Sequence, residues 1–296
     1  MKFHDFGQFL FNSSVFDLKK LSEMISEAKD IQPTFSTAAI FQRFISVSEV
    51  IKIFSESEFA VEKNFMEYFR THSQDVQKKY DEVVQNFLNA DKTAELTESL
   101  EEPSTKLAQV LVDRNLKFEQ FEKILEDYHR EEFSPVEKVF ADWYSTLTFE
   151  RKFDYPPSLD VAKDFHGFLT ESLKTTIIFS STPVDTVEKL FGASVKIQGA
   201  MPVVIGVLAE QNTLHKLANS YDDFVSEDIE EDFDSVAEML NVFTGNFTVK
   251  VASQLGIEEE LYPPLFGRLE KNVFSFLTVT CDFGNFYLYI GEEEIF

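Results

Sequence analysis

The chain has 296 residues, and at roughly 100–200 residues per domain this length favours two domains over one. Its 27 basic and 52 acidic residues give a formal net charge of −25, which excludes binding to DNA, RNA or anionic lipid surfaces through clustered lysines and arginines. A single cysteine excludes an intrachain disulfide, and no window approaches the ~20 apolar residues of a membrane span. We therefore expect a cytoplasmic protein whose partners are neutral or locally positive.

Residues 1–150 have the pattern of an all-helical domain with weak internal repeats. The segment Phe6-Gly-Gln-Phe-Leu-Phe-Asn12 is similar to Leu107-Ala-Gln-Val-Leu-Val-Asp113, and segments 38–50 and 59–65 are candidate further copies. Each copy predicts a short helix, a turn and a second amphipathic helix. Such units must stack to bury their apolar faces.

The best candidate for a domain boundary is the segment Arg151-Lys-Phe-Asp-Tyr-Pro-Pro-Ser158. Two adjacent prolines end a helix and stiffen a connection. We therefore divide the chain into a helical domain at 1–150 and a second domain at 151–296.

The second domain alternates between helical and strand patterns. A helix is expected from an N-cap at Ser158, a short helix at 211–220, and a long helix that ends near Leu255 with Gly256 after it. The expected strands are 176–180, 195–198, 203–208, 273–280 and 286–290, with the last two joined by a hairpin turn at 282–285. A long helix with strands near it occurs twice in this domain. The predicted fold class is therefore α+β, with two long helices packed on one antiparallel sheet.

The long helix carries a polar pair on its predicted outer face. Glu238 and Asn241 are three residues apart, so they project from one face one turn apart. Gly245 follows on that face, although a glycine costs a helix about 1 kcal/mol relative to alanine. Its use is either room for an approaching backbone or tight helix packing in the core, and the sequence favours neither.

The order of these residues resembles the CheX branch of the CheC/CheX/FliY chemotaxis phosphatases, over roughly residues 158–291. The resemblance rests on Glu238, Asn241, Gly245, Asn246, Leu255, Gly256, Pro263 and Pro264. It implies a phosphatase that accelerates hydrolysis of the aspartyl phosphate of a CheY-type response regulator. In that family's scheme Asn241 orients the attacking water, and Glu238 docks to a lysine of the regulator.

The same resemblance implies further details of the site. The partner-binding residues would be Gly245, Thr244, Asn246 and Thr248, and Mg²⁺ would be held by the regulator, with no cofactor or metal on this chain. The first long helix carries no Glu-x-x-Asn, which implies one active face per chain. Edge-to-edge joining of sheets would give a homodimer. The strand 286–290 is either the edge that joins the copies or an edge that the acidic ending Glu292-Glu-Glu294 guards against pairing.

Other chemistries find little support in the sequence. The five histidines lack metal-ligand spacing, and the phosphate-loop and dinucleotide motifs are missing. Cys281 and Trp143 are expected in the core rather than in a site. The acidic run 222–234 is either a solvated loop or a docking surface for a lysine-bearing regulator.

The repeats of the first domain resemble the helical N-terminal modules of type II secretion ATPases. Asp5 and Lys106 occupy the positions of an arginine that some of those modules use to bind a cyclic dinucleotide. Without the guanidinium, we expect a protein-docking or regulatory module. Two alternatives to a phosphatase remain at this stage: a non-catalytic protein that sequesters the phosphorylated regulator, and an adaptor in motility or secretion.

Overall fold

A computed structural model provides the structure of this protein. It describes residues 6–46, 49, 52, 74–114, 116, 118–130, 135–145, 157–181, 189–199, 202–222, 225–256, 259–269 and 276–296. The predicted boundary segment 151–156 and the candidate repeat 59–65 lie outside these residues.

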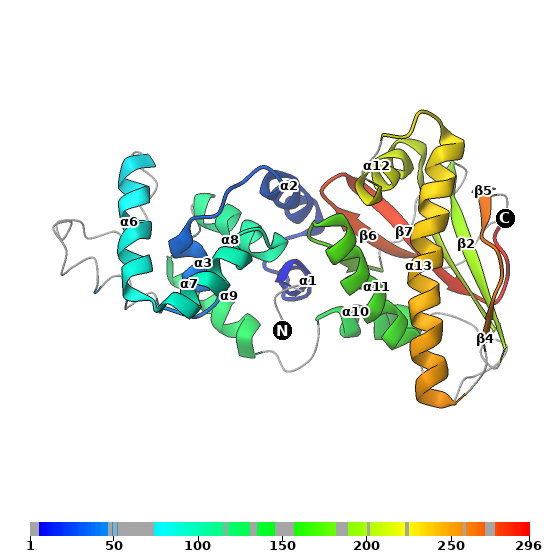
Figure 1. The fold of residues 1–296 in the computed structure, drawn as a ribbon, viewed down its shortest axis with the longest axis horizontal. Helices are drawn as coiled ribbons and strands as arrows, with labels where there is room; N and C mark the ends of the chain where they lie inside the picture. Colours follow the sequence, from blue (N-terminus) through cyan, green and yellow to red (C-terminus); the bar gives the residue numbers. More distant parts are fainter. Residues whose placement is uncertain are drawn as a thin grey trace.

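The N-terminal part of the described chain is helical (Figure 1). Its helices are α1 (Phe6–Asn12), α2 (Leu18–Ala28), α3 (Phe35–Phe41), α6 (Gln74–Phe87), α7 (Ala90–Ser99), α8 (Pro103–Asp113) and α9 (Phe118–Arg130). We call α1 to α9 the helical unit. It has a hydrophobic core of its own, in which the rings of Phe6, Phe41 and Tyr128 lie within 6.2 Å of one another.

Helices α1 and α8 make matching hydrogen bonds. The buried Gln8 donates to Asn12 Oδ1 at 3.0 Å, and the buried Gln109 donates to Asp113 Oδ1 at 2.9 Å. The chain turns back in the same way after each helix, with Val15 N–H donating to Leu10 O and Leu116 N–H to Leu111 O. The sequence similarity of these two segments therefore corresponds to similar local structure.

The C-terminal part is built on an antiparallel sheet. Its strands are β1 (Ile178–Ser180), β2 (Leu190–Gly199), β3 (Val203–Glu210), β4 (Glu259–Leu261), β5 (Leu265–Arg268), β6 (Leu277–Cys281) and β7 (Gly284–Gly291). Their order is β1-β6-β7-β3-β2-β4, and β5 also pairs with β2. Together with the helices, this antiparallel sheet confirms the predicted α+β fold class.

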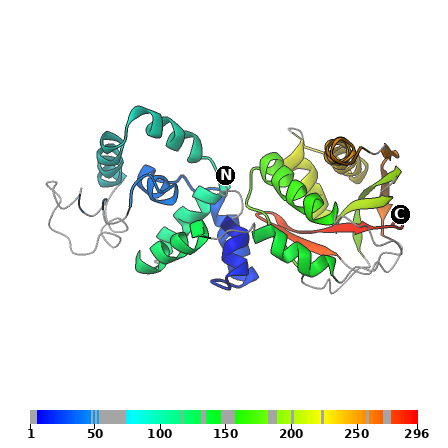
Figure 2. The same cartoon turned by 90° about the horizontal axis from the view of Figure 1, so that it is seen from below.

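Helices α11 (Pro157–Leu173), α12 (Gln211–Tyr221) and α13 (Ile229–Leu255) share one core with the sheet. Alternate residues of the strands, such as Val195 and Val207, point into this core. Figure 2 shows α13 end-on, above the strands. The opposite face of the sheet carries a smaller cluster that includes Tyr289 and Ile295.

Helix α10 (Pro135–Tyr144) packs on α11 and β1, and it also contacts α1 of the helical unit. Its buried residues Val136, Phe140 and Trp143 belong to the sheet core, which confirms Trp143 as a core residue. Apart from Ile178 of β1, which is buried in the core of the helical unit, the two cores separate between Tyr128 and Val136 among the described residues. The division of the chain at 150 stays a prediction.

The expected edge strand is not at an edge. Residues 286–290 lie within β7, which pairs with β6 on one side and β3 on the other. Among the described strands, the ends of the sheet are β1 and the pair β4 and β5. The expectation was wrong because β7 lies between β6, its partner in the hairpin, and β3, which comes from a distant segment of the chain.

Within the described residues, the structure contains no helix with the length and apolar character needed to cross a membrane.

Candidate functional site

Helix α13 is defined at both ends by capping residues. The Asp228 side chain accepts hydrogen bonds from the N–H groups of Glu230 and Glu231 at 3.0 and 3.1 Å. At the other end Gly256 has a φ of 65°, the left-handed conformation that glycine adopts without penalty. The helix boundaries predicted from the sequence are therefore correct at its C-terminal end.

One stripe of α13 is buried against the sheet and against α11. Its members are the residues predicted to face inward: Val236, Leu240, Phe243, Phe247 and Val251. The ring of Phe243 contacts that of Phe165 on α11 edge-on at 4.7 Å. Lys250 donates to both carboxylate oxygens of Asp164 on α11, at 2.6 and 2.8 Å. These contacts hold the helix in place and determine which residues face outward.

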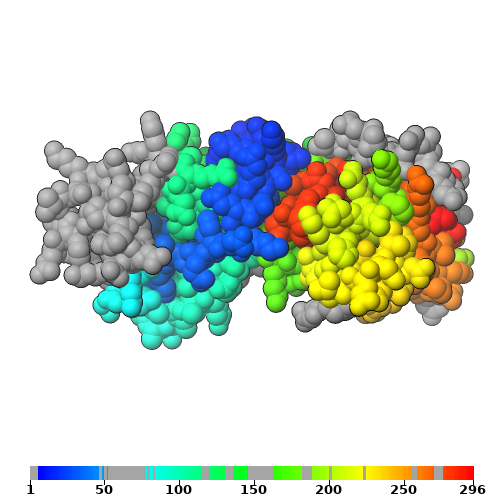
Figure 3. Space-filling view, turned by 90° about the horizontal axis from the view of Figure 1, so that it is seen from above, coloured from blue at the N-terminus to red at the C-terminus, as the bar shows by residue number. Residues whose placement is uncertain are grey.

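The opposite stripe of α13 faces solvent, and we call it the outward face of α13. It consists of Glu238, Asn241, Val242, Gly245 and Val249, all at least partly exposed. Glu238 and Asn241 are both exposed, as the predicted site requires, and their side chains make no hydrogen bond or ion pair within the described part of the chain. Figure 3, which looks along α13 from its N-terminal end, shows this end, in yellow, at the surface.

Gly245 lies open on this face. A Cβ atom placed on it would have one neighbour within 4 Å, Leu261 Cδ1 at 3.9 Å, which is an ordinary van der Waals distance. Among the described elements, no helix packs tightly against this glycine. Of the two uses that the sequence left open, tight packing in the core is therefore wrong.

Three of the expected partner-binding residues are not on the outward face. Thr244 is fully buried and its hydroxyl donates to Leu240 O at 2.7 Å, and Thr248 is also buried. Asn246 is exposed, but five residues of an α-helix place it about 140° around the axis from Asn241. We therefore retain only Gly245 of that group, because neighbourhood in sequence does not give a common face on a helix.

Residues distant in sequence also lie beside α13. The partly buried Leu261 of β4 and the exposed Phe266 of β5 lie on the α13 side of the sheet, and we call them the apolar shoulder, whereas Tyr262 and Leu265 alternate to the other face. The Phe266 ring stacks on Phe233 of α13 at 5.5 Å. The sequence analysis missed these residues, since only the pairing of β4 and β5 with β2 brings them beside α13.

Tyr221, at the end of α12, was also missed. Burial raises the pKa of its hydroxyl, and the nearby carboxylates of Glu238 and Asp222 raise it further. The Tyr221 hydroxyl therefore lies close enough to the Glu238 carboxylate for the negative charge to affect it.

A polar network joins α12, the loop before α13 and the first turn of α13. His215 Nδ1 is 3.0 Å from the buried Asp232 carboxylate, and Ser226 hydrogen-bonds to that same carboxylate. Ser226 N–H donates to Asn219 Oδ1 at 2.8 Å. Ser226 and Asp232 both lie on the Nδ1 side of the ring, whereas a nucleophilic triad needs them at opposite nitrogens. The network therefore positions α13 and does not form a nucleophile.

Two further observations concern other chemistries. Among the residues that the structure describes, no cluster of His, Cys, Asp and Glu side chains could hold a metal ion. Cys281 is buried in β6, and burial raises the pKa of its thiol to about 12. This pKa fits the core position that we predicted for Cys281 and excludes a thiolate nucleophile at neutral pH.

Comparison with known proteins gives similarity to solved structures alone. No family model matches the chain, and no curated protein matches it. The chain is similar to the chemotaxis protein CheX of Desulfovibrio desulfuricans, with 17% identity, 44% of this chain and 97% of that chain covered, and a TM-score of 0.35. It is also similar to CheX of Vibrio vulnificus, with 14% identity, 46% and 96% covered, and a TM-score of 0.36.

A third similar structure is the CheX-CheY-BeF3-Mg+2 complex of Borrelia burgdorferi. Its identity to this chain is 21%, the comparison covers 47% of this chain and 98% of that chain, and the TM-score is 0.36. All three similarities cover less than half of this chain and nearly all of the solved one. They concern one domain-sized part of the protein.

Proposed function

We propose that this protein is a phosphatase for the aspartyl phosphate of a CheY-type response regulator in the cytoplasm. The observation that carries the proposal is the exposure of Glu238 and Asn241 side by side on a rigidly held helix, with both side chains available to a second protein. The sequence resemblance to CheX supports the same reading. A CheY protein is the partner in the Borrelia burgdorferi complex.

The chemistry of the reaction suits a carboxamide. Hydrolysis of an acyl phosphate needs a water held in line with the breaking P–O bond and neutralisation of the charge on the phosphoryl oxygens. The amide of Asn241 can accept one hydrogen bond from this water and donate another, so it can orient the nucleophile without acting as a base. The aspartate and the Mg²⁺ that neutralises charge would belong to the regulator.

Glu238 has the second role in this proposal. Its carboxylate would pair with a lysine of the regulator and so fix the helix against the phosphorylated site. An exposed ion pair contributes little, but one buried by two protein surfaces is screened less and is worth more. Gly245, which lacks a side chain, would leave room for the partner's backbone one turn further on.

The surroundings of the pair favour a protein as the substrate. The exposed residues of α13 change along the helix, from the carboxylates Glu230, Glu231 and Asp234 in its first turns to the uncharged Val242 and Val249. The apolar shoulder lies beside the helix. Adjacent charged and apolar patches are typical of a surface that binds another protein. A small phosphorylated metabolite would instead need a concave site with cationic groups.

The decay of phosphate from a labelled response regulator tests the proposal. We expect Asn241→Ala to lower the acceleration by about 100-fold, equivalent to ~2.7 kcal/mol of barrier, because the water loses its orienting group. Gln254→Ala is a matched control, since it removes an exposed carboxamide of the same helix about 20 Å from Asn241. With this control variant, the regulator should lose its phosphate as fast as with the wild-type protein.

Equal rates for wild type and Asn241→Ala would contradict a phosphatase. If the wild-type protein then bound the phosphorylated regulator and slowed its decay, the sequestering protein would be the correct alternative. Titration of the regulator by each variant, followed by fluorescence anisotropy, checks that a slower decay with Asn241→Ala reflects lost chemistry and not lost binding, because this variant should keep most of the affinity.

A further inference from the structure

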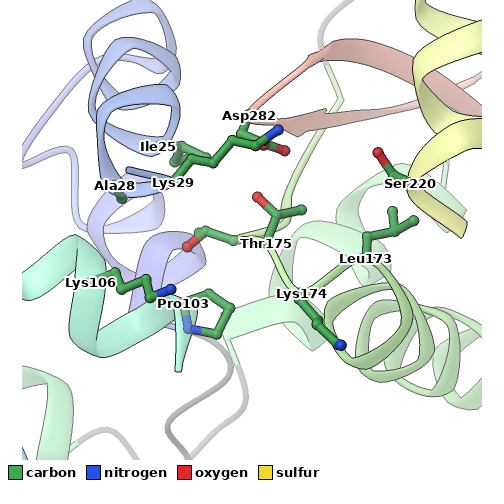
Figure 4. Close-up of a pocket in the computed structure, with 11 residues that line it drawn as sticks. Ile25, Ala28, Lys29, Pro103, Lys106, Leu173, Lys174, Thr175, Ser220 and Asp282 are labelled. Carbon is green, nitrogen blue, oxygen red and sulfur yellow. The ribbon is translucent and has the colours of Figure 1, made fainter. Parts of the chain in front are cut away.

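The helical unit and the sheet leave a cavity where they meet. Its volume is about 220 Å³, and Figure 4 shows the residues that line it. One wall comes from α2 and α8 of the helical unit. The opposite wall comes from the end of α11, the segment 174–176, the end of α12 and the turn between β6 and β7. The cavity therefore lies at a junction between two cores, where ligand sites are often found.

The segment that lines this cavity continues into β1, and β1 holds the two walls together. Gln8 Oε1 accepts a hydrogen bond from Phe179 N–H at 2.6 Å, and Gln8 Nε2 donates to Phe179 O at 2.9 Å. The neighbouring Ile178 is buried in the core of the helical unit, whereas Phe179 is buried in the core of the sheet. A Cβ atom on Gly7 would collide with Thr176 Cγ2, so the glycine lets α1 come close to this segment. The cavity is thus formed by walls that are fixed before any ligand binds.

The lining of the cavity is basic, although the chain as a whole is strongly acidic. It holds three lysines, Lys29, Lys106 and Lys174, and one carboxylate, Asp282, whereas the chain has 52 acidic and 27 basic residues. Asp282 pairs with Lys29 at 3.2 Å, and Lys106 pairs with the exposed Glu101 at 2.9 Å. Lys174 makes no hydrogen bond or ion pair within the described part of the chain. Among these groups one ammonium is left without a counter-charge, which favours an anionic ligand.

Two buried hydroxyl groups of the lining also lack a protein partner. Thr175 and Thr176 are 8% and 3% exposed, and neither hydroxyl makes a hydrogen bond to any residue that the structure describes. Figure 4 shows the Thr175 hydroxyl pointing into the cavity, toward Lys29 and Asp282. A buried hydroxyl normally has a hydrogen-bond partner. A ligand with acceptor oxygens would provide one, because hydroxyls can donate and ammonium groups are donors only.

Lys174 has a backbone conformation that is unfavourable for lysine. It follows directly after α11, and its φ is 50°. Glycine is the usual residue in this left-handed conformation after a helix, because a Cβ atom is strained there. Such outliers gather at functional sites, where the side chain has a use that outweighs the strain. The exposed Lys174 lies at the rim of the cavity, and in Figure 4 its ammonium points away from Thr175, so it would turn inward when an anion binds.

We propose that this cavity binds a small organic oxyanion, a phosphate monoester or a polycarboxylate, which contacts the helical unit and the sheet at once. Lys106 and Lys174 would contact the anionic groups, and Thr175 and Thr176 would donate to their oxygens. A volume of about 220 Å³ equals that of roughly seven waters, which is more than inorganic phosphate needs and less than a nucleotide needs. The bound anion would join the two parts of the protein that line the cavity.

Isothermal titration calorimetry of the full-length chain tests this proposal. The probes are glycerol 3-phosphate, which carries a phosphate monoester, and succinate, which carries carboxylates, and glycerol is the uncharged control. We expect at least one of the two anions to bind saturably with one site per chain, with an affinity that falls as the salt concentration rises. Glycerol should not bind, and the anion that binds more tightly identifies the type of oxyanion.

Lys174→Gly separates the contact with the ligand from the stability of the fold. This variant loses the ammonium and relieves the left-handed backbone, so it should resist urea at least as well as wild type and bind the anion at least tenfold more weakly. Arg43→Gly is the matched control, because the exposed Arg43 follows α3 with a φ of 60° and is not part of the lining. It loses the same charge and should keep the wild-type affinity. Thr175→Val removes one hydroxyl donor, should weaken binding severalfold, and replaces Lys174→Gly if that variant does not fold.

Two results would overturn the proposal. The first is the absence of saturable binding of both anions to the wild-type chain, which would mean that the cavity holds only water. The second is an equal affinity of the Lys174 and Arg43 variants for the anion, which would mean that the anion binds elsewhere or responds only to the total charge of the chain.

Discussion

Asn241 and Thr244 lie three residues apart on one helix, yet only Asn241 reaches solvent. The difference arises because the buried stripe of α13 is wide enough to include Thr244, whose hydroxyl then bonds back to Leu240 O. A buried hydroxyl must find a partner, and the preceding helical turn supplies one. The chemistry of each residue on this helix is therefore determined by its angle about the axis.

Cys281 offers a prediction at the same scale. Because it is buried and burial raises the pKa of its thiol to about 12, we expect a thiol reagent at pH 8 to leave the native protein unmodified. The same reagent should modify one thiol per chain after unfolding in guanidinium. Stoichiometric modification of the native protein at the rate of a free thiol would contradict the buried position.

The raised pKa also predicts a dependence of stability on pH. The folded protein holds the proton more tightly than the unfolded chain, in which the thiol titrates near pH 8.5. The free energy of unfolding should therefore fall as the pH rises from about 9 towards 12. Denaturant unfolding across this range checks the slope, and Cys281→Ala should reduce it.

At the scale of elements, the proposed site depends on a helix with well-defined ends. Asp228 begins α13 with two hydrogen bonds, and three acidic residues in the first turn suit the positive end of the helix dipole. The network of His215, Asn219, Ser226 and Asp232 then ties this turn to α12. Helix α13, which carries Glu238 and Asn241, is thus held in place both by its N-terminal cap and by its contacts with the core.

Asp228→Ala should lower the free energy of unfolding by about 1 kcal/mol, because two N–H groups lose their acceptor. Asp228→Asn keeps an acceptor oxygen and should stay within a few tenths of the wild-type value. Urea denaturation followed by circular dichroism measures both. Equal destabilisation by the two variants would show that charge, and not the cap hydrogen bonds, is what matters at this position.

At the scale of the whole molecule, the charge of −25 bears on partner binding. Glu230, Glu231 and Asp234 are exposed on the first turns of α13, on the approach to Glu238. A partner with a lysine-bearing face would be attracted by these carboxylates over the ~10 Å Debye length at 0.1 M salt. The excess of negative charge would then affect the binding of a partner more than the stability of the fold.

We therefore expect the affinity for a response regulator to fall as the salt concentration rises. Replacing Glu230, Glu231 and Asp234 by their amides should reduce both the affinity at low salt and its salt dependence. Anisotropy titrations between 50 and 500 mM NaCl would measure this, in a range where the screening length changes severalfold. An affinity that is unchanged across this range would contradict docking by the acidic turn.

The sequence by itself determined the α+β class, the helix that presents Glu238 and Asn241, and the burial of Trp143 and Cys281. These follow from local periodicity and capping residues, since side chains three and four apart share a helical face whatever surrounds the helix. The tertiary structure alone decided which strand lies at an edge, where the apolar shoulder sits, and how Gln8 meets Phe179. Such contacts join residues as much as 171 positions apart, and no local pattern encodes the order in which strands pair.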